Sequence, residues 1–552
     1  MAYVITQNCC KDESCVPVCP VDCIRPASGP GEFTGTEMLY IDPVTCIDCG
    51  ACAEECPVDA IYFEEELPPG MERFREINAT YFEHHPLQPE EKRHSAGYHR
   101  GIEPGSLRVA IVGGGPAACY AASELIHTDG VEVNLFERLP TPFGLIRSGV
   151  APDHQHTKSV VDTFKHAFTD RRFHCYLNVE VGQHLSHEDL LAHHHAVIYA
   201  VGASKSRELS IPGEELPGNY GAAEFVGWYN GHPDHAHHDF DLSSERAVIV
   251  GNGNVALDVA RILLMPAEEL AKTDIADHAL KALSESKIRE VIILGRRGPR
   301  DGAFSVGEFL ALGYLPGIDI VIDSDELEAG SEDGVETKLK LDIAREYAQR
   351  DSSPDNKRIT FRFLTSPTEV VGDGRVEGLR VVHNTRNDTG GLVKGDPAQG
   401  TELINTSLIL RSIGYRGAPI EGLPYDPTMG IVMNDRGRVL DDDDAALSGT
   451  YVTGWCKRGP RGVIGTNRMC AQETVAKLWE DYDEGRLSHD VKDRAGIDAL
   501  LKQNGADPVG WQGWCAIDAA ESEQGAQTSR PRVKFVDIAD MLNVAQGANC
   551  AS

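Results

Sequence analysis

The chain has 552 residues, which is too long for a single hydrophobic core and predicts about three domains. Its 41% hydrophobic and 25% charged residues are typical of a soluble globular protein. The formal net charge of -33 argues against nucleic acid or an anionic membrane surface as a partner, because both attract basic patches, and it would suit a basic docking partner. There is no apolar run of about 18 residues and no signal-like start, so we expect a cytoplasmic protein with no membrane-spanning segment.

The cysteines are concentrated near the N-terminus. Nine of the fifteen lie between Cys9 and Cys56, in ligand-like spacing, and the other six are scattered. This concentration predicts metal binding in a reducing compartment rather than a disulfide framework. We therefore expect residues 1–66 to form an iron–sulfur module with short β-strands at its ends, in "YVIT" and "AIYFEE".

Two interlocked cysteine motifs, each ending in Cys-Pro, define the ligands. The stretch "CIDCGACAEECP" (46–57) has the spacing C-x2-C-x2-C-x3-C-P, in which the cysteine before proline reaches the other cluster. Thiolates in this pattern are ligands of iron–sulfur clusters, whereas three cysteines in seven residues suit tetrahedral zinc poorly. The crossover rule predicts one 4Fe–4S cluster on Cys46, Cys49, Cys52 and Cys19, and a second cluster on Cys9, Cys15 and Cys56.

The second cluster has Asp12 where a fourth thiolate is expected, in "CCKDESCVPVCP" (9–20). A carboxylate is a harder and weaker ligand for cluster iron, so the site would hold a 3Fe–4S cluster or a labile 4Fe–4S cluster with an oxygen ligand. Asp12 would otherwise be a solvated acid on the rim of a 3Fe–4S site. Cys10 is an alternative to Cys9, and Cys23 is expected to be a buried neighbour rather than a ligand.

These motifs resemble those of bacterial seven-iron ferredoxins, which hold one 3Fe–4S and one 4Fe–4S cluster. The first spacing in that family is usually C-x7-C, whereas Cys9 and Cys15 are separated as C-x5-C. The resemblance implies an α+β two-cluster ferredoxin domain, with the nuclearity of the first cluster left open.

Residues 67–106 are rich in proline and charge without sustained periodicity, which predicts a linker. From residue 107 onward, strand-like runs alternate with helical patterns, as in an α/β doubly wound sheet. One pattern of strand, glycine turn and helix occurs twice, in "VAIVGGGPAACYAA" (109–122) and "AVIVGNGNVALDVA" (247–260). Two dinucleotide sites are therefore expected.

The two turns differ in the residues that end the following strand. Gly113, Gly115 and Ala118 form a G-x-G-x-x-A fingerprint, and Glu137 ends the next strand, where an acid hydrogen-bonds ribose hydroxyls. The second fingerprint consists of Gly251, Gly253 and Ala256. Its next strand-like run ends in the pair Arg296 and Arg297, and two guanidinium groups there suit the 2′-phosphate of NADPH.

The stretches "LPTPFGLIRSGVAPDH" (139–154) and "GWCKRGPRGVIGTNRMCAQETVAKLWE" (454–480) closely resemble NADPH–ferredoxin reductases of the adrenodoxin-reductase type, and the resemblance covers nearly all of 107–552. The whole chain resembles the actinobacterial fusion of a ferredoxin with such a reductase. This implies an α/β two-Rossmann flavoprotein whose FAD domain (107–206 and 417–552) is split by an NADP domain (207–416). The resemblance places FAD contacts on Ala118, Glu137, Leu145, Val181, Trp455, Gly462, Val463 and Ile464. It places NADP contacts on Arg207, Asn252, Gly253, Asn254, Val255, Arg296, Arg297, Glu308 and Gly462.

Two residues are candidates for a catalytic role. His154 closes "APDH" and titrates near neutrality, so we expect it to tune or protonate the flavin edge, although a structural hydrogen-bonding histidine fits as well. Glu308 is the second candidate.

The expected function is transfer of a hydride from NADPH to FAD, followed by single-electron transfer to the iron–sulfur clusters of the chain itself or to a separate ferredoxin. A cytochrome is another one-electron acceptor of the right kind. Two alternatives belong to other classes: an electron-input subunit of a larger flavin complex, and a redox sensor with a labile cluster beside Asp12.

Overall fold

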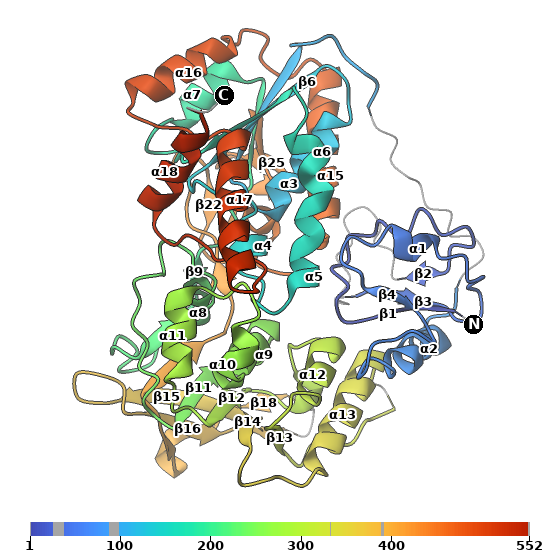
Figure 1. The fold of residues 1–552 in the computed structure, drawn as a ribbon, viewed down its shortest axis with the longest axis vertical. Helices are drawn as coiled ribbons and strands as arrows, with labels where there is room; N and C mark the ends of the chain where they lie inside the picture. Colours follow the sequence, from blue (N-terminus) through green and yellow to red (C-terminus); the bar gives the residue numbers. More distant parts are fainter. Residues whose placement is uncertain (1, 26–37, 88–98, 332, 388–390, 550–552) are drawn as a thin grey trace.

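The computed structural model describes residues 2–25, 38–87, 99–331, 333–387 and 391–549. Figure 1 shows two stacked lobes with a smaller N-terminal module beside their junction. We use "N-terminal module" for the described residues up to the end of α2, "seven-stranded lobe" for 107–204 and 417–549, and "six-stranded lobe" for 205–416.

The N-terminal module is closed by pairing of its two ends. β1 (Tyr3–Ile5) runs antiparallel to β4 (Ile61–Phe63), as the sequence predicts, and β2 (Ile24–Arg25) pairs with β3 (Tyr40–Ile41). The short helix α1 (Ala51–Glu54) carries Cys52 inward. These pairings hold the two cysteine-rich segments side by side.

Part of the predicted linker is folded onto this module. Helix α2 (Phe74–His84) buries Phe74, Ile77 and Phe82. Burial of these apolar side chains explains why this segment is a packed helix and not an extended linker. Asn78 ties the helix to both small sheets: its Nδ2 donates to the Ile5 carbonyl at 2.8 Å and its Oδ1 accepts from the Ile41 amide at 2.9 Å. The linker prediction is therefore wrong for 74–84, and residues 88–98 lie outside the described part.

The seven-stranded lobe is built from two distant parts of the chain. Its sheet has the order β24-β25-β26-β8-β5-β6-β7, and the five strands from β26 to β7 are parallel. The strands are β5 (Leu107–Val112), β6 (Val131–Glu137), β7 (Phe173–Leu177), β8 (Ala196–Tyr199), β24 (Asn434–Asp435), β25 (Arg438–Leu440) and β26 (Ala446–Val452). Its helices are α3 (Pro116–Ile126), α4 (Leu145–Ser148), α5 (Gln155–Lys158), α6 (Lys165–Phe168), α7 (His187–His193), α14 (Trp455–Arg458), α15 (Thr466–Asp483), α16 (Arg494–Gln503), α17 (Trp511–Gln527) and α18 (Ile538–Asn549), with a 3-10 turn at Ser159–Phe164.

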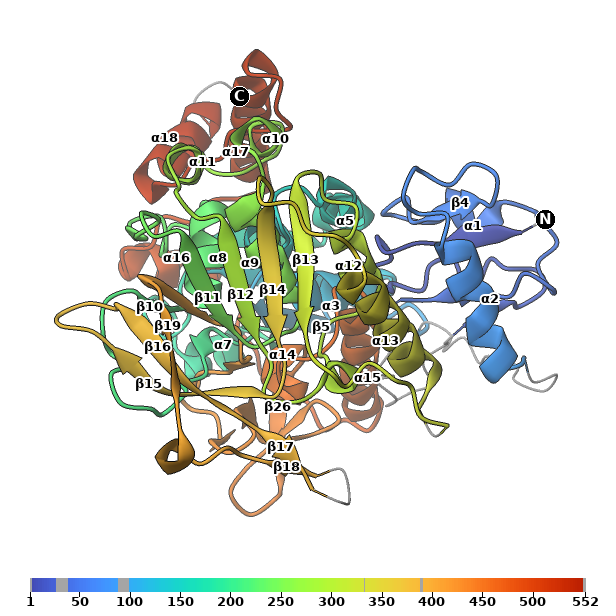
Figure 2. The ribbon, with the colours of Figure 1, turned by 90° about the horizontal axis from the view of Figure 1, so that it is seen from below.

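The six-stranded lobe has an all-parallel sheet of order β10-β20-β11-β12-β14-β13. Its strands β11, β12, β14 and β13 lie side by side in Figure 2. Its strands are β10 (Asn219–Gly221), β11 (Arg246–Val250), β12 (Glu290–Leu294), β13 (Ile318–Asp323), β14 (Lys357–Arg362) and β20 (Leu408–Arg411). Its helices are α8 (Ala222–Tyr229), α9 (Asn254–Leu264), α10 (Ala267–Leu270), α11 (Asp277–Ser284), α12 (Val306–Leu312) and α13 (Val335–Ala348).

Shorter strands complete the second lobe and its borders. β15 (Thr365–Val371), β16 (Gly378–His383) and β19 (Glu402–Asn405) form an antiparallel sheet. Three two-stranded ribbons pair β17 (Thr385–Arg386) with β18 (Leu392–Val393), β9 (Lys205–Ser206) with β21 (Tyr415–Arg416), and β22 (Tyr425–Asp426) with β23 (Ile431–Val432). The β9–β21 ribbon marks where the chain enters and leaves the six-stranded lobe.

A helix needs about 18 strongly apolar residues to cross a bilayer, and no helix in the described segments has them.

The module contacts both lobes. On the six-stranded lobe, Arg73 pairs with Glu346 at 2.8 Å, and Gly307 leaves room for the side chain of Gln7, to which an added Cβ would come within 3.0 Å. On the seven-stranded lobe, the Ser159 hydroxyl donates to the Pro57 carbonyl at 3.0 Å. The module therefore bridges the two lobes rather than extending from one of them.

The two lobes are also joined by a buried charge cluster. Asp274 of the six-stranded lobe lies 2.7 Å from Lys158 and 3.0 Å from Lys534, which both belong to the other lobe. Its side chain is 3% exposed and that of Lys534 is 1% exposed. Burial alone would raise the pKa of Asp274, but the two ammonium groups hold it well below its usual value. The single carboxylate is shared by two buried amino groups, and burial lowers the pKa of both Lys158 and Lys534.

Replacing Asp274 with Asn should destabilise the folded chain by roughly 3–5 kcal/mol, because two buried ammonium groups lose their counter-charge. Thermal unfolding followed by circular dichroism measures the change. Glu269→Gln is the control, since its pair with Lys272 is exposed and should contribute little. Equal melting temperatures for the two variants would contradict the role given to Asp274.

Candidate cluster and dinucleotide sites

Five cysteines line one cavity in the module, the four predicted ligands of the 4Fe–4S site and Cys23. Cys19, Cys46, Cys49 and Cys52 line it together with Tyr3, Ile41 and Gly50. All four thiols are free. Burial, with smaller contributions from the neighbouring thiols Cys46, Cys19 and Cys49, raises the pKa of Cys52 to about 12. Such mutual repulsion between thiolates is relieved when a cationic metal centre binds them, so the donor set fits an iron–sulfur cluster.

The chain bends tightly around this cavity. Asp48 and Gly50 both adopt left-handed backbone conformations, with φ of 59° and 76°. These conformations turn the intervening cysteines toward one centre, which is why short C-x2-C spacings suffice. Cys23 is 2% exposed and lies 3.4 Å from Cys19, sulfur to sulfur, in the position expected of a buried neighbour.

A second group forms around Cys9, Cys15 and Cys56. Burial raises the pKa of Cys9 to about 12, with smaller contributions from Cys56 and Asp12. Burial also raises the pKa of Cys15, and Cys9, Asp12 and Cys56 add to the effect. The two cysteine groups thus follow the predicted crossover. In the described segments no three cysteine sulfurs lie within 4.8 Å of one another, as a single zinc ion would require.

Asp12 is buried. Its exposed fraction is 7%, so the interpretation of Asp12 as a solvated acid on the rim is wrong. Its carboxylate accepts hydrogen bonds from the Ser14 hydroxyl and, at 3.3 Å, from the Ser14 amide. An acid that is buried beside three thiols is well placed to face cluster iron, because few other groups there would compensate its charge.

The first dinucleotide turn lies between β5 and α3. Gly113 has φ of 104°, and a Cβ there would meet the Ala200 carbonyl at 2.6 Å, so only glycine fits. Gly115, at the start of α3, has open space where a Cβ would stand. This is the space that a pyrophosphate needs above a helix N-terminus. Glu137 ends β6, and its Oε2 accepts from the Gly114 amide at 2.6 Å.

The other predicted FAD residues gather around this turn or stand on the elements beside it. Ala118 is fully buried in α3, Leu145 begins α4 and is 45% exposed, and Trp455 begins α14. Gly462, Val463 and Ile464 immediately precede α15, whose contacts with α3 are extensive. Val181 lies in the segment after β7, where it forms a bridge with Leu185.

The second turn lies between β11 and α9. Gly251 has φ of 109°, and a Cβ there would lie 2.1 Å from the Ser412 carbonyl. Asn252, Gly253, Asn254 and Val255 lead into α9. Arg296 and Arg297 follow β12 and are exposed, and no described carboxylate forms an ion pair with either. Arg207 is exposed on the β9 side and donates to the Tyr415 carbonyl at 3.2 Å. A 2′-phosphate would supply the missing counter-charge of the two arginines.

The two candidate catalytic residues are brought together between the lobes. His154, Glu308 and Asp258 have ligand atoms within 4.8 Å of one another. Arg261 donates to Nε2 of His154 at 3.1 Å and pairs with Asp258 at 2.5 Å. A guanidinium among these groups disfavours a metal ion. It also requires His154 to present Nε2 as an acceptor, which places the proton of the neutral ring on Nδ1.

Asp258 and Arg261 were not predicted from the sequence. They stand three residues apart on α9, so both face the same side of the helix. Burial raises the pKa of Asp258 despite the attraction of Arg261 and His154. The sequence feature that could have indicated these two residues is the presence of charges on the otherwise apolar helix "NVALDVARILL". Buried charges need a partner, so such charges predict an ion pair.

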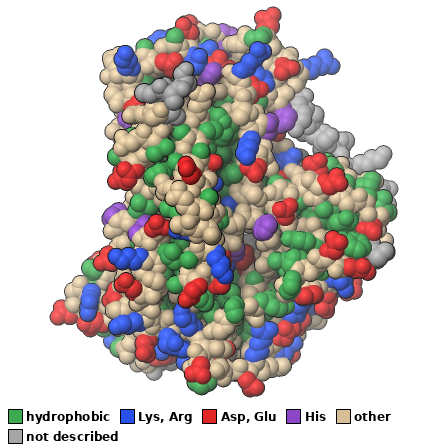
Figure 3. Space-filling model, viewed as in Figure 1, with side chains coloured by type: hydrophobic (Ala, Val, Ile, Leu, Met, Phe, Trp, Pro, Cys, Tyr) green, Lys and Arg blue, Asp and Glu red, His purple; other side chains and the backbone are tan. Residues whose placement is uncertain are grey.

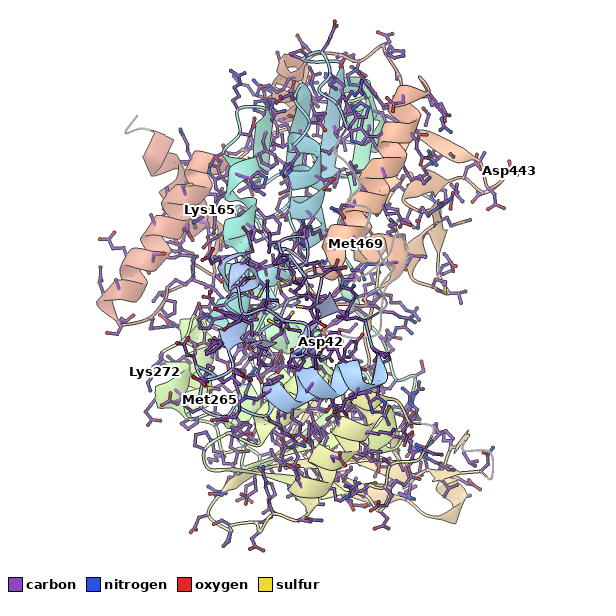
Figure 4. The ribbon with its side chains drawn as sticks, turned by 90° about the vertical axis from the view of Figure 1, so that its right-hand side faces the viewer. Asp42, Lys165, Met265, Lys272, Asp443 and Met469 are labelled. Atoms are coloured by element: carbon purple, nitrogen blue, oxygen red, sulfur yellow. The ribbon has the colours of Figure 1, made fainter. Side chains whose placement is uncertain are left out.

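The module docks directly on the start of α15. The Gly465 amide donates to the Cys10 carbonyl at 2.9 Å, and Arg468 donates to the Asp12 carbonyl at 2.7 Å and to the Ser14 hydroxyl at 3.3 Å. Cys10 is 4% exposed and joins the apolar core of the seven-stranded lobe. Figure 4 labels Met469, next to Arg468, just above the module that carries Asp42. The Asp12 group of cysteines therefore faces the lobe that carries the first dinucleotide turn.

Comparison with known proteins agrees with this arrangement. A family model described as pyridine nucleotide-disulphide oxidoreductase matches residues 107–293, and one described as a 4Fe-4S binding domain matches residues 39–62. A probable ferredoxin/ferredoxin–NADP reductase of Mycobacterium leprae is 44% identical over 99% of this chain and 98% of its own length. Its counterpart in Mycobacterium tuberculosis is 46% identical over 99% of this chain and 96% of its own length.

The chain belongs to the ferredoxin/ferredoxin–NADP reductase family. Among solved structures, Mycobacterium tuberculosis FprA in complex with NADPH matches 81% of this chain and 100% of its own, with 42% identity and a TM-score of 0.74. The N-terminal module of this reductase is thus ferredoxin-like, and the two lobes have the fold of an FprA-like oxidoreductase.

Docking of the module in this reductase should depend on glycine at position 465, because glycine has no Cβ. Its backbone angles (φ -66°, ψ -25°) suit any residue, but a Cβ would lie 2.1 Å from the Lys11 backbone. Gly465→Ala should therefore loosen the module, giving a larger radius of gyration by small-angle X-ray scattering and faster limited proteolysis.

Gly510→Ala is the matched control, because Gly510 also precedes a helix and a Cβ there would meet nothing within 4 Å. An unchanged scattering profile for Gly465→Ala would show that the module does not rely on this contact.

Proposed function

We propose that this reductase takes a hydride equivalent from NADPH and passes the electrons singly to iron–sulfur clusters held by its own N-terminal module. FAD, when bound, supplies the conversion between two-electron and one-electron transfer that this reaction needs. The seven-stranded lobe, with residues 107–206 and 417–552, would bind FAD, and the inserted residues 207–416 would bind NADPH. The support is that each lobe carries one glycine turn between a parallel strand and a helix.

The residues at the two turns would do different work. The open N-terminus of α3 at Gly115 would receive a pyrophosphate, and Glu137, fixed by the Gly114 and Leu139 amides, would orient a ribose. Arg296 and Arg297 would hold the 2′-phosphate and so select NADPH over NADH. These assignments account for two exposed guanidinium groups that form no ion pair with a carboxylate of the described segments.

Between the turns, His154 and Glu308 would face the place where the two dinucleotides meet. Arg261 donates to Nε2 of His154 and so fixes the orientation of the ring. Asp153 holds Arg261 at 3.0 Å from the other side. These side chains position the reacting edge and limit the access of water.

The observation that carries this proposal is the docked module. The backbone of residues 10–12 touches Gly465, which directly follows the predicted FAD segment Gly462–Ile464. The Asp12 group of thiols therefore lies on the flavin side, and the Cys49 group lies farther out. Electron transfer would then run through the Asp12 site first. We propose a 4Fe–4S cluster at the Cys49 site and, beside Asp12, a 3Fe–4S cluster or a 4Fe–4S cluster with an oxygen ligand.

An anaerobic NADPH titration followed by low-temperature electron paramagnetic resonance tests the proposal. NADPH should bleach the flavin absorbance and reduce at least one cluster. In a rapid freeze-quench series the signal assigned to the Asp12 site should change first, because the order in time follows distance whereas the order at equilibrium follows reduction potential. Asp12→Cys should stabilise a fourth iron there, seen as a higher iron content. Flavin bleaching with all cluster signals unchanged would overturn the internal route.

The NADPH preference should depend on the arginine pair. In the double variant Arg296→Ala with Arg297→Ala, we expect the KM for NADPH to rise about ten- to hundredfold while the KM for NADH stays unchanged, because two charge-assisted contacts to the 2′-phosphate are lost. Steady-state reduction of ferricyanide measures both constants. Arg375→Ala, an exposed arginine of the same lobe, should leave them unchanged. Parallel increases for NADPH and NADH would place the arginine pair away from the 2′-phosphate.

A further inference from the structure

The two cysteine groups differ in access from outside. In the Asp12 group, Cys15 is buried and the adjoining Cys10 and Asp12 are covered by α15. In the other group, Cys49 is exposed. A protein partner approaching from solvent can therefore come close to the Cys49 site, whereas the reductase itself occupies the approach to the Asp12 site.

The loop around the Cys49 site is apolar. Val44 is 91% exposed and Ile47 is 57% exposed, and both flank Cys46. Exposed aliphatic side chains of this size next to a ligand set are unusual in a module whose other described valines and isoleucines are buried or partly buried. Figure 3 shows apolar atoms interspersed with acidic ones on this module, at the right of the molecule.

Acidic side chains surround this apolar spot. Asp48 and Glu66 are exposed. Both lie near Tyr3, whose ring lies over Gly50. Burial raises the pKa of Tyr3, and these two carboxylates and the thiols of Cys52 and Cys49 add to the effect. Residues 1–66 contain thirteen acidic and two basic side chains. The two basic ones, Lys11 and Arg25, are 4% and 9% exposed, so within the described part of residues 1–66 no exposed cation offsets the negative charge. The exposed Arg75 of α2 lies 3.7 Å from Glu64.

We propose that Val44, Ile47, Asp48, Cys49 and Glu66 form an exit face that docks a basic one-electron carrier protein. The inference rests on the proposed function and adds where electrons leave and which surface chemistry receives them. An apolar centre within an acidic rim is complementary to a redox protein whose own cofactor edge is ringed by lysines or arginines. A second copy of this chain is disfavoured, because like-charged faces would repel each other.

The electrons balance as follows. One NADPH gives two electrons and becomes NADP⁺ with release of one proton, and two carrier molecules each take one electron at the exit face. For ferric cytochrome c as the carrier, two Fe³⁺ become two Fe²⁺. No further oxidant or reductant is needed.

Cytochrome c, a basic one-electron protein, serves as the probe, and ferricyanide serves as a small acceptor that needs no docking face. The test variant combines Asp48→Asn with Glu66→Lys. Asparagine tolerates the left-handed backbone at position 48, so the cluster loop keeps its shape. The control variant, Asp442→Asn with Asp443→Lys, makes the same change in net charge at exposed positions far from the module (Figure 4).

The expected result is a Kd for oxidised cytochrome c, measured by calorimetry at low ionic strength, at least about tenfold weaker in the test variant, with a matching rise in KM. The control variant should bind as the wild type does, and the ferricyanide rate should stay constant in all three proteins. Ile47→Ala should weaken binding at high ionic strength as well, since its contribution is apolar.

Three results would overturn the exit face: an unchanged Kd in the test variant, an equal loss in the control variant, or a wild-type dimer that Ile47→Ala dissociates, which would assign the face to a second copy. Failure of the proposed function is distinguishable. In that case NADPH would leave the cluster signals unchanged, whereas the calorimetric Kd, which needs no turnover, would still report on the face.

Discussion

Much of the architecture depends on one close approach, between the backbone of residues 10–12 and Gly465 at the start of α15. The contact consists of main chain against main chain, so it has no flexible side chain through which the two parts could drift apart. Arg468 adds two hydrogen bonds to the same loop, and Cys10 is buried in the core of the seven-stranded lobe. The first cysteine group is thereby held at the lobe that carries the first dinucleotide turn. Without this approach the module would be a tethered domain, and the distance between its clusters and the flavin site would vary.

The elements that sequence reasoning reached are those with strong local rules. Cysteine spacing predicted two groups of cysteines that the fold does bring together, since a short C-x2-C segment leaves few ways to wrap a cluster. The two glycine turns were recognisable because Gly113 and Gly251 stand where a Cβ would collide with backbone. The residues that end the two following strands, Glu137 and the arginine pair, then predicted different ligands for the two turns.

Other features were out of reach because they arise between distant segments. Nothing near Gly465 in the sequence indicates that Lys11 packs on it, since its φ is ordinary and only the neighbour excludes a side chain. The alternative that Asp12 is a solvated acid on the rim is wrong because α15 covers the loop that carries it, and the sequence does not show that contact. Helix α2 was hidden in a proline- and charge-rich stretch, as its fold depends on Asn78 reaching two strands of the module. Propensity is a weak guide where tertiary contacts decide.

The bridging position of the module links nucleotide exchange to cluster position. It is fastened to the seven-stranded lobe through Gly465 and Ser159, and to the six-stranded lobe through Arg73 and Gln7. Because the module is attached to both lobes, it resists rotation of one lobe against the other. Any hinge motion that opens the gap between the lobes must therefore stretch or release one of these attachments. Opening of the gap between the lobes and displacement of the two cysteine groups from at least one lobe are therefore the same movement.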